Sequence, residues 1–116
     1  MNSSQDDFLK PYLSVLSDRK AENVVVLDVR SLTSFTDAFI IASGRSNRQV
    51  TAIGQHINKE MKKKGVKAFT VDGLAEGKWV LLDYGDVIIH VFFDETRKFY
   101  NLEGLWADAR RVDVAV

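Results

Sequence analysis

The chain has 116 residues, a length that allows one domain with a single hydrophobic core. Its sixteen basic and sixteen acidic residues cancel, which argues against a protein that mainly neutralises bare phosphate backbone, because such surfaces carry excess basic charge. Cysteine is absent, and this excludes a disulfide framework, a thiolate metal site and a cysteine nucleophile. The sequence starts without a basic segment followed by an apolar one, and no apolar run approaches membrane length, so we expect a cytoplasmic protein without a membrane anchor.

One helix and two strands are predicted in the first third of the chain. Apolar residues recur at helical spacing over residues 9–16, and Pro11 is tolerated only in a first turn, so the helix should begin close to Pro11. We expect the residues before Asp6 to be frayed. Residues 24–29 then have the apolar, β-branched composition of a buried strand, and residues 37–43 predict a second strand after a polar connection.

The clearest helical pattern follows Gly44. Ser46 is a suitable N-cap residue and Gln49 stands three positions later, a capping box in which each side chain accepts a hydrogen bond from the other residue's backbone N–H. Gly65 suits the left-handed conformation that ends many helices. Between these ends, one side of the helix carries an apolar stripe that consists of Val50, Ile53, Ile57 and Met61.

Three more strands are predicted after the long helix. Residues 66–71 indicate a short strand, and residues 79–82 and 87–93 are apolar, β-branched and aromatic runs joined by a turn that contains Gly85. The last run is apolar on both faces, so it should be a central strand. His90 is the exception in that run, a titratable group on an otherwise hydrophobic face.

A final helix is predicted to begin at Asp94, a residue suited to cap it. Gly104 should loosen or end this helix, and residues 110–116 should form a short mobile tail. One side of the helix is apolar and should pack on the core; its residues are Phe99, Leu102 and Trp106.

The elements follow the order α-β-β-α-β-β-β-α, which predicts a mixed α/β fold with five strands and about three helices. We expect one domain over residues 1–116, with an ordered core at about residues 6–108. The connection through the long helix is long enough for a parallel crossover, which should join the strands at 37–43 and 66–71 and make the sheet mixed. Three helices cannot fully cover both faces of five strands, so His90 should lie on or near an open part of one face.

The motifs for nucleotide chemistry are incomplete. Residues 44–47 resemble a phosphate-binding turn at a helix N-terminus, but they lack the glycine patterns of nucleotide-binding loops and also fit a plain capping turn. A nucleotidyltransferase would need paired carboxylates on a neighbouring strand to hold metal, and residues 67–71 carry no acid. Asp83 and Asp86 flank a turn, where solvent-facing acids are expected. We therefore predict no enzymatic activity, no catalytic residue and no cofactor.

Other candidate sites have plainer explanations. His56 and His90 have no third ligand at a suggestive spacing, so we predict no metal site. The lysines at 62–64 could contact nucleic acid, but cations in the last turn of a helix also complement its dipole. The aromatic residues between 79 and 106 exceed what one small core should need, and Trp and Tyr are enriched at protein interfaces.

Three segments form a specific combination: TDAFIIASGRSNRQVTAI over residues 36–53, VDGLAEGKWVLLDYGDVIIHVF over residues 71–92, and R-x-F-Y-x-L-E-x-L-W over residues 97–106. Together they resemble the Iojap-like ribosomal silencing factor family, and the similarity extends from the first helix to Asp108. The resemblance implies a mixed α/β fold related to nucleotidyltransferases but without their catalytic carboxylates.

The resemblance also implies a function. Proteins of this family bind the large ribosomal subunit at ribosomal protein fourteen, block an intersubunit bridge and keep the small subunit from joining, so that translation is repressed when nutrients are short. Assembly of the large subunit through the same surface is an alternative, because organelle members take part in assembly, and a residual nucleotide-processing enzyme is a third. The sequence shows no transit peptide, which favours a bacterial member.

We expect the binding surface on the face built by the predicted hairpin and final helix. A monomer should bind the ribosome, while a homodimer of the free protein and a peripheral contact with ribosomal RNA stay open. By resemblance to the family, the candidate contact residues are Trp79, Tyr84, Asp86, His90, Phe92, Arg97, Tyr100 and Glu103, whereas Leu102 and Trp106 are expected in the core.

Overall fold

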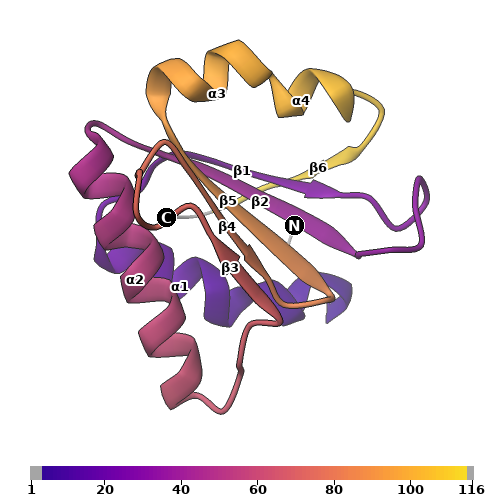
Figure 1. Cartoon of the computed structure of the whole chain (residues 1–116). Helices are drawn as coiled ribbons and strands as arrows, with labels where there is room; N and C mark the ends of the chain where they lie inside the picture. Colours follow the sequence, from indigo (N-terminus) through magenta and orange to yellow (C-terminus); the bar gives the residue numbers. More distant parts are fainter. Residues whose placement is uncertain (1–3, 115–116) are drawn as a thin grey trace.

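Residues 4–114, the part of the chain that this computed structural model describes, form a mixed β-sheet with helices on both faces. Its elements are η1 (Ser4–Leu9), α1 (Lys10–Asp18), β1 (Glu22–Asp28), β2 (Ala38–Gly44), α2 (Asn47–Lys63), β3 (Thr70–Asp72), β4 (Trp79–Asp83), β5 (Val87–Phe93), α3 (Asp94–Tyr100), α4 (Leu102–Leu105) and β6 (Arg110–Val112). Figure 1 shows α1 and α2 on one side of the sheet and α3 and α4 on the other. The predicted mixed α/β fold is confirmed, but the described residues contain six strands where five were expected.

The strand order is β3-β4-β5-β2-β1-β6, and β2 pairs in parallel with β5, not with the strand predicted at residues 66–71. The other neighbouring pairs are antiparallel. From β2 the chain therefore runs through α2, forms the β3-β4-β5 meander and returns beside β2. Burial explains this order: β2 is buried along its whole length and β5 along most of it, whereas β3 is short, mainly exposed and lies at an edge.

The first α-helix begins at Lys10, which places Pro11 in its first turn as predicted. Of the residues before Asp6, which we expected to be frayed, Ser4 and Gln5 belong to the short 3-10 helix η1, and residues 1–3 lie outside the described residues. Asp6 and Leu9 of that turn are buried, so the start of the described chain is packed onto the rest of the molecule.

The strongest helical pattern in the sequence is confirmed in α2. The Ser46 hydroxyl accepts the backbone N–H of Gln49 at 3.0 Å, and all four residues of the predicted apolar stripe are buried. Gly65 has a φ of +84°, and hydrogen bonds back to the last turn close the helix there. One detail differs from the capping box: the Gln49 side chain accepts the N–H of Arg45, at 2.6 Å, and not that of Ser46.

Two hydrophobic clusters occupy the two faces of the sheet within residues 4–114. The larger cluster joins α1 and α2 to the sheet residues that face them, among them Ile89 and Val91 of β5. The smaller cluster lies under α3 and α4 and includes Phe39 and Phe92. As predicted, β5 contributes apolar side chains to both faces and is a central strand.

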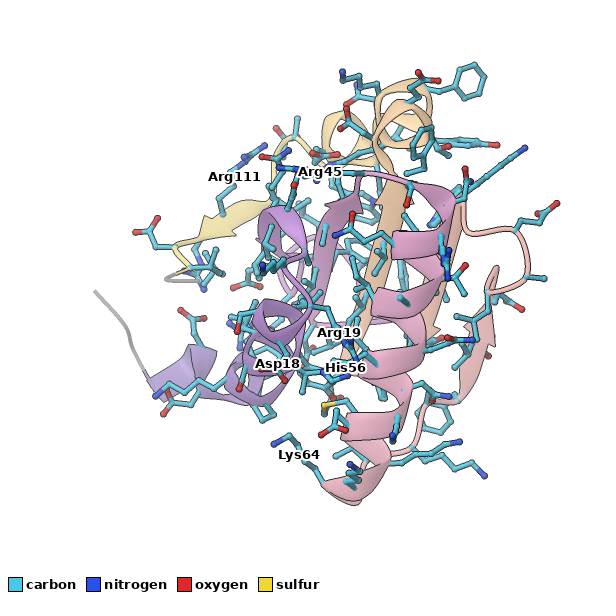
Figure 2. The ribbon with its side chains drawn as sticks, turned by 90° about the vertical axis from the view of Figure 1, so that its left-hand side faces the viewer. Asp18, Arg19, Arg45, His56, Lys64 and Arg111 are labelled. Atoms are coloured by element: carbon cyan, nitrogen blue, oxygen red, sulfur yellow. The ribbon has the colours of Figure 1, made fainter. Side chains whose placement is uncertain are left out.

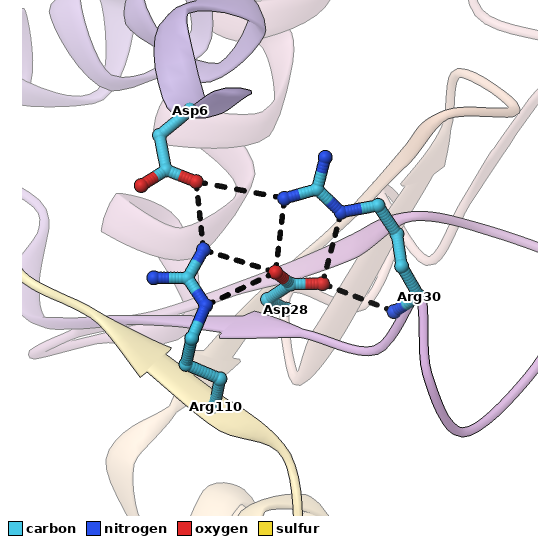
Figure 3. A network of polar contacts seen from close by, with 4 residues as sticks. All are labelled: Asp6, Asp28, Arg30 and Arg110. Carbon is cyan, nitrogen blue, oxygen red and sulfur yellow. Dashed lines mark hydrogen bonds and ion pairs between the residues drawn. The ribbon is translucent and has the colours of Figure 1, made fainter. Parts of the chain in front are cut away.

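A network of four charged residues joins the two ends of the described chain. Arg110 of β6 donates to Asp6 of η1 at 2.8 Å and to Asp28 of β1 at 2.9 Å. Arg30 also donates to Asp28, at 2.9 Å, as Figure 3 shows. Hydrogen bonds from Arg30 and then Arg110 hold the pKa of Asp28 well below its ordinary range. β6 is therefore a bound edge strand and not, as predicted, the start of a mobile tail; residues 115–116 lie outside the described residues.

The predicted final helix is divided into α3 and α4. Asn101 is left-handed with a φ of +48°, and its side-chain oxygen accepts the N–H of Gly104 at 3.3 Å, so the break lies at Asn101 and not at Gly104. Asp94 is the first residue of α3 and not its cap, and no side-chain cap bond closes that end within the described chain. Phe99 was expected in the core but is 81% exposed; the other two residues of the predicted apolar side pack against the smaller cluster.

Candidate partner-binding site

Short helices cover the sheet face that carries the smaller hydrophobic cluster. α3 has seven residues and α4 has four, whereas the opposite face is covered by α1 and by the 17 residues of α2. Large apolar side chains stay exposed on the two short helices: Phe99 is 81% exposed, Leu105 77% and Tyr100 49%. A group of exposed apolar and aromatic residues is typical of a surface that a partner covers.

α3 is inverted relative to an ordinary amphipathic helix, because it buries an arginine and exposes aromatic residues. Arg97 donates to the Ser43 hydroxyl and the Asn23 carbonyl, both at 2.8 Å, and to the Glu103 carboxylate at 2.9 Å. These bonds tie α3 to β2, β1 and α4. Arg97 and Glu103, predicted as contact residues, therefore form an internal ion pair that orients α3 with its aromatic residues outward.

Trp79 lies at the edge of this face and is held by a buried histidine. Its indole Nε1–H donates to Nδ1 of His90 at 3.1 Å, and its ring packs on Phe92 and Tyr100, with 4.8 Å between centroids in each pair. Burial lowers the pKa of His90 to about 4, so the imidazole is neutral at physiological pH and Nδ1 can accept. The proton then resides on Nε2, which has no hydrogen-bond partner among residues 4–114.

His90 is not on an open part of the face, and this prediction was wrong. It is 5% exposed and lies against the rings of Trp79, Phe39 and Phe92. The prediction counted only helices as cover, whereas aromatic side chains of neighbouring strands close over the imidazole. His90 and Phe92 consequently lie beneath the surface and hold Trp79 in place.

Two predicted contact residues lie at the other end of the hairpin. Tyr84 is 7% exposed and packs against Tyr12 in the larger cluster, with 5.2 Å between ring centroids, and burial raises its pKa to about 12. Asp86 is exposed, and its backbone carbonyl accepts the N–H groups of Asp37 and Ala38. The length of β5 separates both residues from α3.

A groove of about 400 Å³ lies between β4 and α3. Its apolar lining consists of Trp79, Leu81 and Tyr100. The charged residues that line it are Asp72, Glu76 and Lys78, which sequence reasoning did not single out. Gly73 and Gly77, on either side of Glu76, could have pointed to these residues, because paired glycines indicate a loop that approaches another segment closely.

Gly73 shows why this loop requires glycine. Its φ is +89°, and a Cβ at this position would lie 2.0 Å from the backbone oxygen of Trp79. A side chain is therefore excluded, and the loop can fold back against β4. The same fold places Glu76 and Trp79 on the walls of one groove.

Polar groups elsewhere form structural contacts. Arg45, beside the capping turn, pairs with Glu22. His56 lies 3.2 Å from the Asp18 carboxylate and connects α2 to α1, as Figure 2 shows. Within residues 4–114, no three His, Cys, Asp or Glu side chains are grouped as a metal ion would require, and no helix has the length and apolar character to cross a membrane.

Comparison with known proteins identifies the family of this fold. The family model described as ribosomal silencing factor during starvation matches residues 2–116. This chain belongs to the ribosomal silencing factor family. The resemblance drawn from its three sequence segments is thereby confirmed.

Relatives in this family match the chain over most of its length. Ribosomal silencing factor RsfS of Halalkalibacterium halodurans is 37% identical over 111 residues, which are 96% of this chain and 95% of the relative. The protein of the same name from Bacillus subtilis is also 37% identical over 111 residues, covering 96% of this chain and 94% of its own. A crystal structure of a Chromobacterium violaceum protein, 34% identical, has a TM-score of 0.85 and covers 98% of this chain and 94% of that one.

Proposed function

We propose that this member of the family acts in the cytoplasm, binds the large ribosomal subunit through ribosomal protein fourteen, and blocks an intersubunit bridge. The small subunit is then kept from joining, and translation is repressed when nutrients are limited. The inversion of α3 carries the proposal, because it buries Arg97 and presents Phe99 and Tyr100 near Trp79. Such a surface excludes a competitor by occupying space, so the mechanism needs affinity and rigidity but no catalysis.

Two features of the face favour a protein as the partner. Trp and Tyr are enriched at interface hot spots, and the Trp79 ring is fixed by His90 and Phe92 before a partner arrives. A side chain that is already ordered loses little conformational entropy on binding. The zero net charge suits local charge matching with a protein, with ribosomal RNA contacted only at the periphery.

Within the proposed surface, Trp79 and Tyr100 make the central contacts. One copy of the chain supplies both rings, so we propose that a monomer binds the ribosome. Tyr84 and Asp86 lie at the opposite end of the hairpin and therefore outside the centre of the contact. The residues that hold the central rings in position are His90, Phe92, Arg97 and Glu103.

Sedimentation of purified large subunits with the protein tests this assignment. Wild type should co-sediment, while Trp79→Ala and Tyr100→Ala should each bind roughly 30-fold more weakly, equivalent to the loss of about 2 kcal/mol at a hot spot. Phe69→Ala is the matched control, because Phe69 is 80% exposed and lies beside Gly85, far from α3. Full binding by both face variants, or an equal loss in the control, would contradict the assignment.

A measurement in cells separates repression from a role in assembly through the same face. Under repression, loss of the protein should increase subunit joining in nutrient-limited cells and leave large subunits fully assembled. Accumulation of large-subunit precursors with unchanged joining would instead support the assembly role.

A further inference from the structure

The groove between β4 and α3 combines two aromatic rings with charged side chains. The rings of Trp79 and Tyr100 are tilted by 49° with centroids 4.8 Å apart, and both line the groove. Asp72 and Glu76 line it as well, and neither carboxylate forms a hydrogen bond or ion pair within residues 4–114. Lys78 is the other charged residue of the groove, so two negative charges stand against one positive charge.

The carboxylates of this groove differ from those that meet an arginine of the chain itself. Asp28 and Glu103 each accept from the guanidinium groups of internal arginines. Asp72 and Glu76 are solvent-exposed and have no such partner in the described part of the chain. The groove therefore presents carboxylates that could accept from an arginine, whereas at Asp28 and Glu103 the arginine is supplied by the chain itself.

We propose that this groove binds an arginine side chain of the protein partner. The inference rests on the proposed function, because it specifies what the face recognises on that partner. The guanidinium plane lies against the rings of Trp79 and Tyr100, and its N–H groups donate to Asp72 and Glu76. Leu81, also in the lining, contacts the methylene stem.

Each part of the groove matches a property of arginine. The guanidinium group is planar, stacks on aromatic faces and donates through a rigid fork that fits carboxylates. The ammonium group of lysine is a compact and strongly hydrated charge, so lysine should bind here more weakly. The two carboxylates repel phosphate, which makes RNA an unfavourable occupant of the same groove.

An NMR titration with N-acetyl-arginine amide tests the groove without a ribosome. The indole Nε1–H signal of Trp79 should shift in a saturable manner, and N-acetyl-citrulline amide, which has nearly the same shape without the charge, should bind at least about tenfold more weakly. The Asp72→Asn/Glu76→Gln variant should reduce arginine binding by a similar factor. Equal binding of the citrulline probe, or no saturable shift with the arginine probe, would overturn the inference.

Binding to the large subunit separates this inference from the proposed function. The Asp72→Asn/Glu76→Gln variant should bind at least about tenfold more weakly than wild type and with a smaller salt dependence. The charge-matched control Asp7→Asn/Asp113→Asn alters exposed acids outside the groove and should bind normally. If wild type and the groove variant bind the subunit equally, the groove inference fails and the proposed function stands. If wild type does not bind, the proposed function fails and the arginine titration decides the groove.

Discussion

α2 and α3 pack on opposite faces of the same sheet, yet they place their apolar and charged residues in opposite ways. α2 buries an apolar stripe and leaves Lys62 and Lys63 in water. α3 buries Arg97 and leaves Phe99 and Tyr100 exposed. The apolar surface of α2 is therefore already used to stabilise the fold, whereas that of α3 is available to a partner.

The difference follows from the groups that each helix meets. α2 packs against apolar side chains such as Val80, whereas α3 faces the Ser43 hydroxyl and the Asn23 carbonyl. A buried cation is tolerated where acceptors and an opposite charge surround it, and Glu103 supplies that charge. A short helix can thus be anchored to a sheet through one arginine and leave its aromatic residues exposed.

The largest effect is expected on the α2 face. Ile57 is fully buried, so Ile57→Ala should leave a cavity and lower the free energy of unfolding by about 4 kcal/mol. Urea unfolding measures this loss, and the fraction that remains folded should bind large subunits like wild type. A loss below roughly 1 kcal/mol, or a binding defect in the folded fraction, would contradict the account in which the α2 face stabilises the fold and the α3 face binds the partner.

Arg97→Ala should affect both stability and binding. Removal of the guanidinium leaves Glu103 and the Ser43 hydroxyl without their partner and should cost about 3 kcal/mol, the lower end of the range because Glu103 is 21% exposed and can be hydrated. α3 should also lose its orientation, so subunit affinity should fall in the folded protein. Wild-type affinity in a variant shown to be folded by circular dichroism would show that Arg97 does not position the aromatic residues.

The neutral state of His90 predicts a pH dependence of stability. Its pKa in the folded protein is about 4, below the ordinary value of 6.5, so the unfolded chain binds more protons between these two values. The free energy of unfolding should therefore decrease as the pH falls from 6.5 to 4, by about 3 kcal/mol in total. Asp28 has a depressed pKa and contributes its own loss only at lower pH.

His90→Asn isolates this contribution, because asparagine does not titrate and its side-chain oxygen can still accept from Trp79. Urea midpoints measured from pH 7 to pH 4 should show a smaller slope in the variant than in wild type. The same slope in both proteins would mean that His90 is not the residue responsible.

The smallest effect is expected at the start of α2. Ser46→Ala removes the oxygen that accepts the Gln49 N–H and should lower the free energy of unfolding by about 1 kcal/mol. Binding to the large subunit should not change, since this cap belongs to the α2 side of the molecule. An unaltered urea midpoint would show that the cap contributes nothing to stability.

Local patterns in the sequence predicted the elements whose neighbours are close along the chain. The Ser46 cap, the apolar stripe and Gly65 defined α2, and the turn at Gly85 defined the β4-β5 hairpin. The parallel partner of β2 was predicted wrongly, because two strands of the meander compete for one position and burial across the whole sheet decides between them. β6 was missed because Arg110 and Arg111 are unlike strand residues; pairing with β1 and the charge network hold them there.

The candidate site was predicted less completely than the fold. The spacing of the aromatic residues drew attention to the segment that carries Phe99 and Tyr100, but periodicity cannot show which side of a helix faces the sheet. That choice depends on acceptors from two distant segments, Asn23 and Ser43, which meet Arg97 only in the folded chain, and on Glu103 six residues further on. The groove acids escaped notice for a similar reason. Asp72 ends β3 and reaches Leu81 of β4 only through strand pairing, and Glu76 lies in a loop that folds back against β4 at Gly73.

Light scattering of purified subunits tests most directly whether the face around Trp79 and Tyr100 keeps the ribosomal subunits apart. Wild-type protein should suppress the rise in scattering that accompanies subunit association, and Phe69→Ala should suppress it equally. The Trp79→Ala/Tyr100→Ala variant, folded at the assay temperature by circular dichroism, should let the subunits associate as they do without protein. If this folded variant suppresses association as well as wild type does, the face is not the ribosome-binding surface.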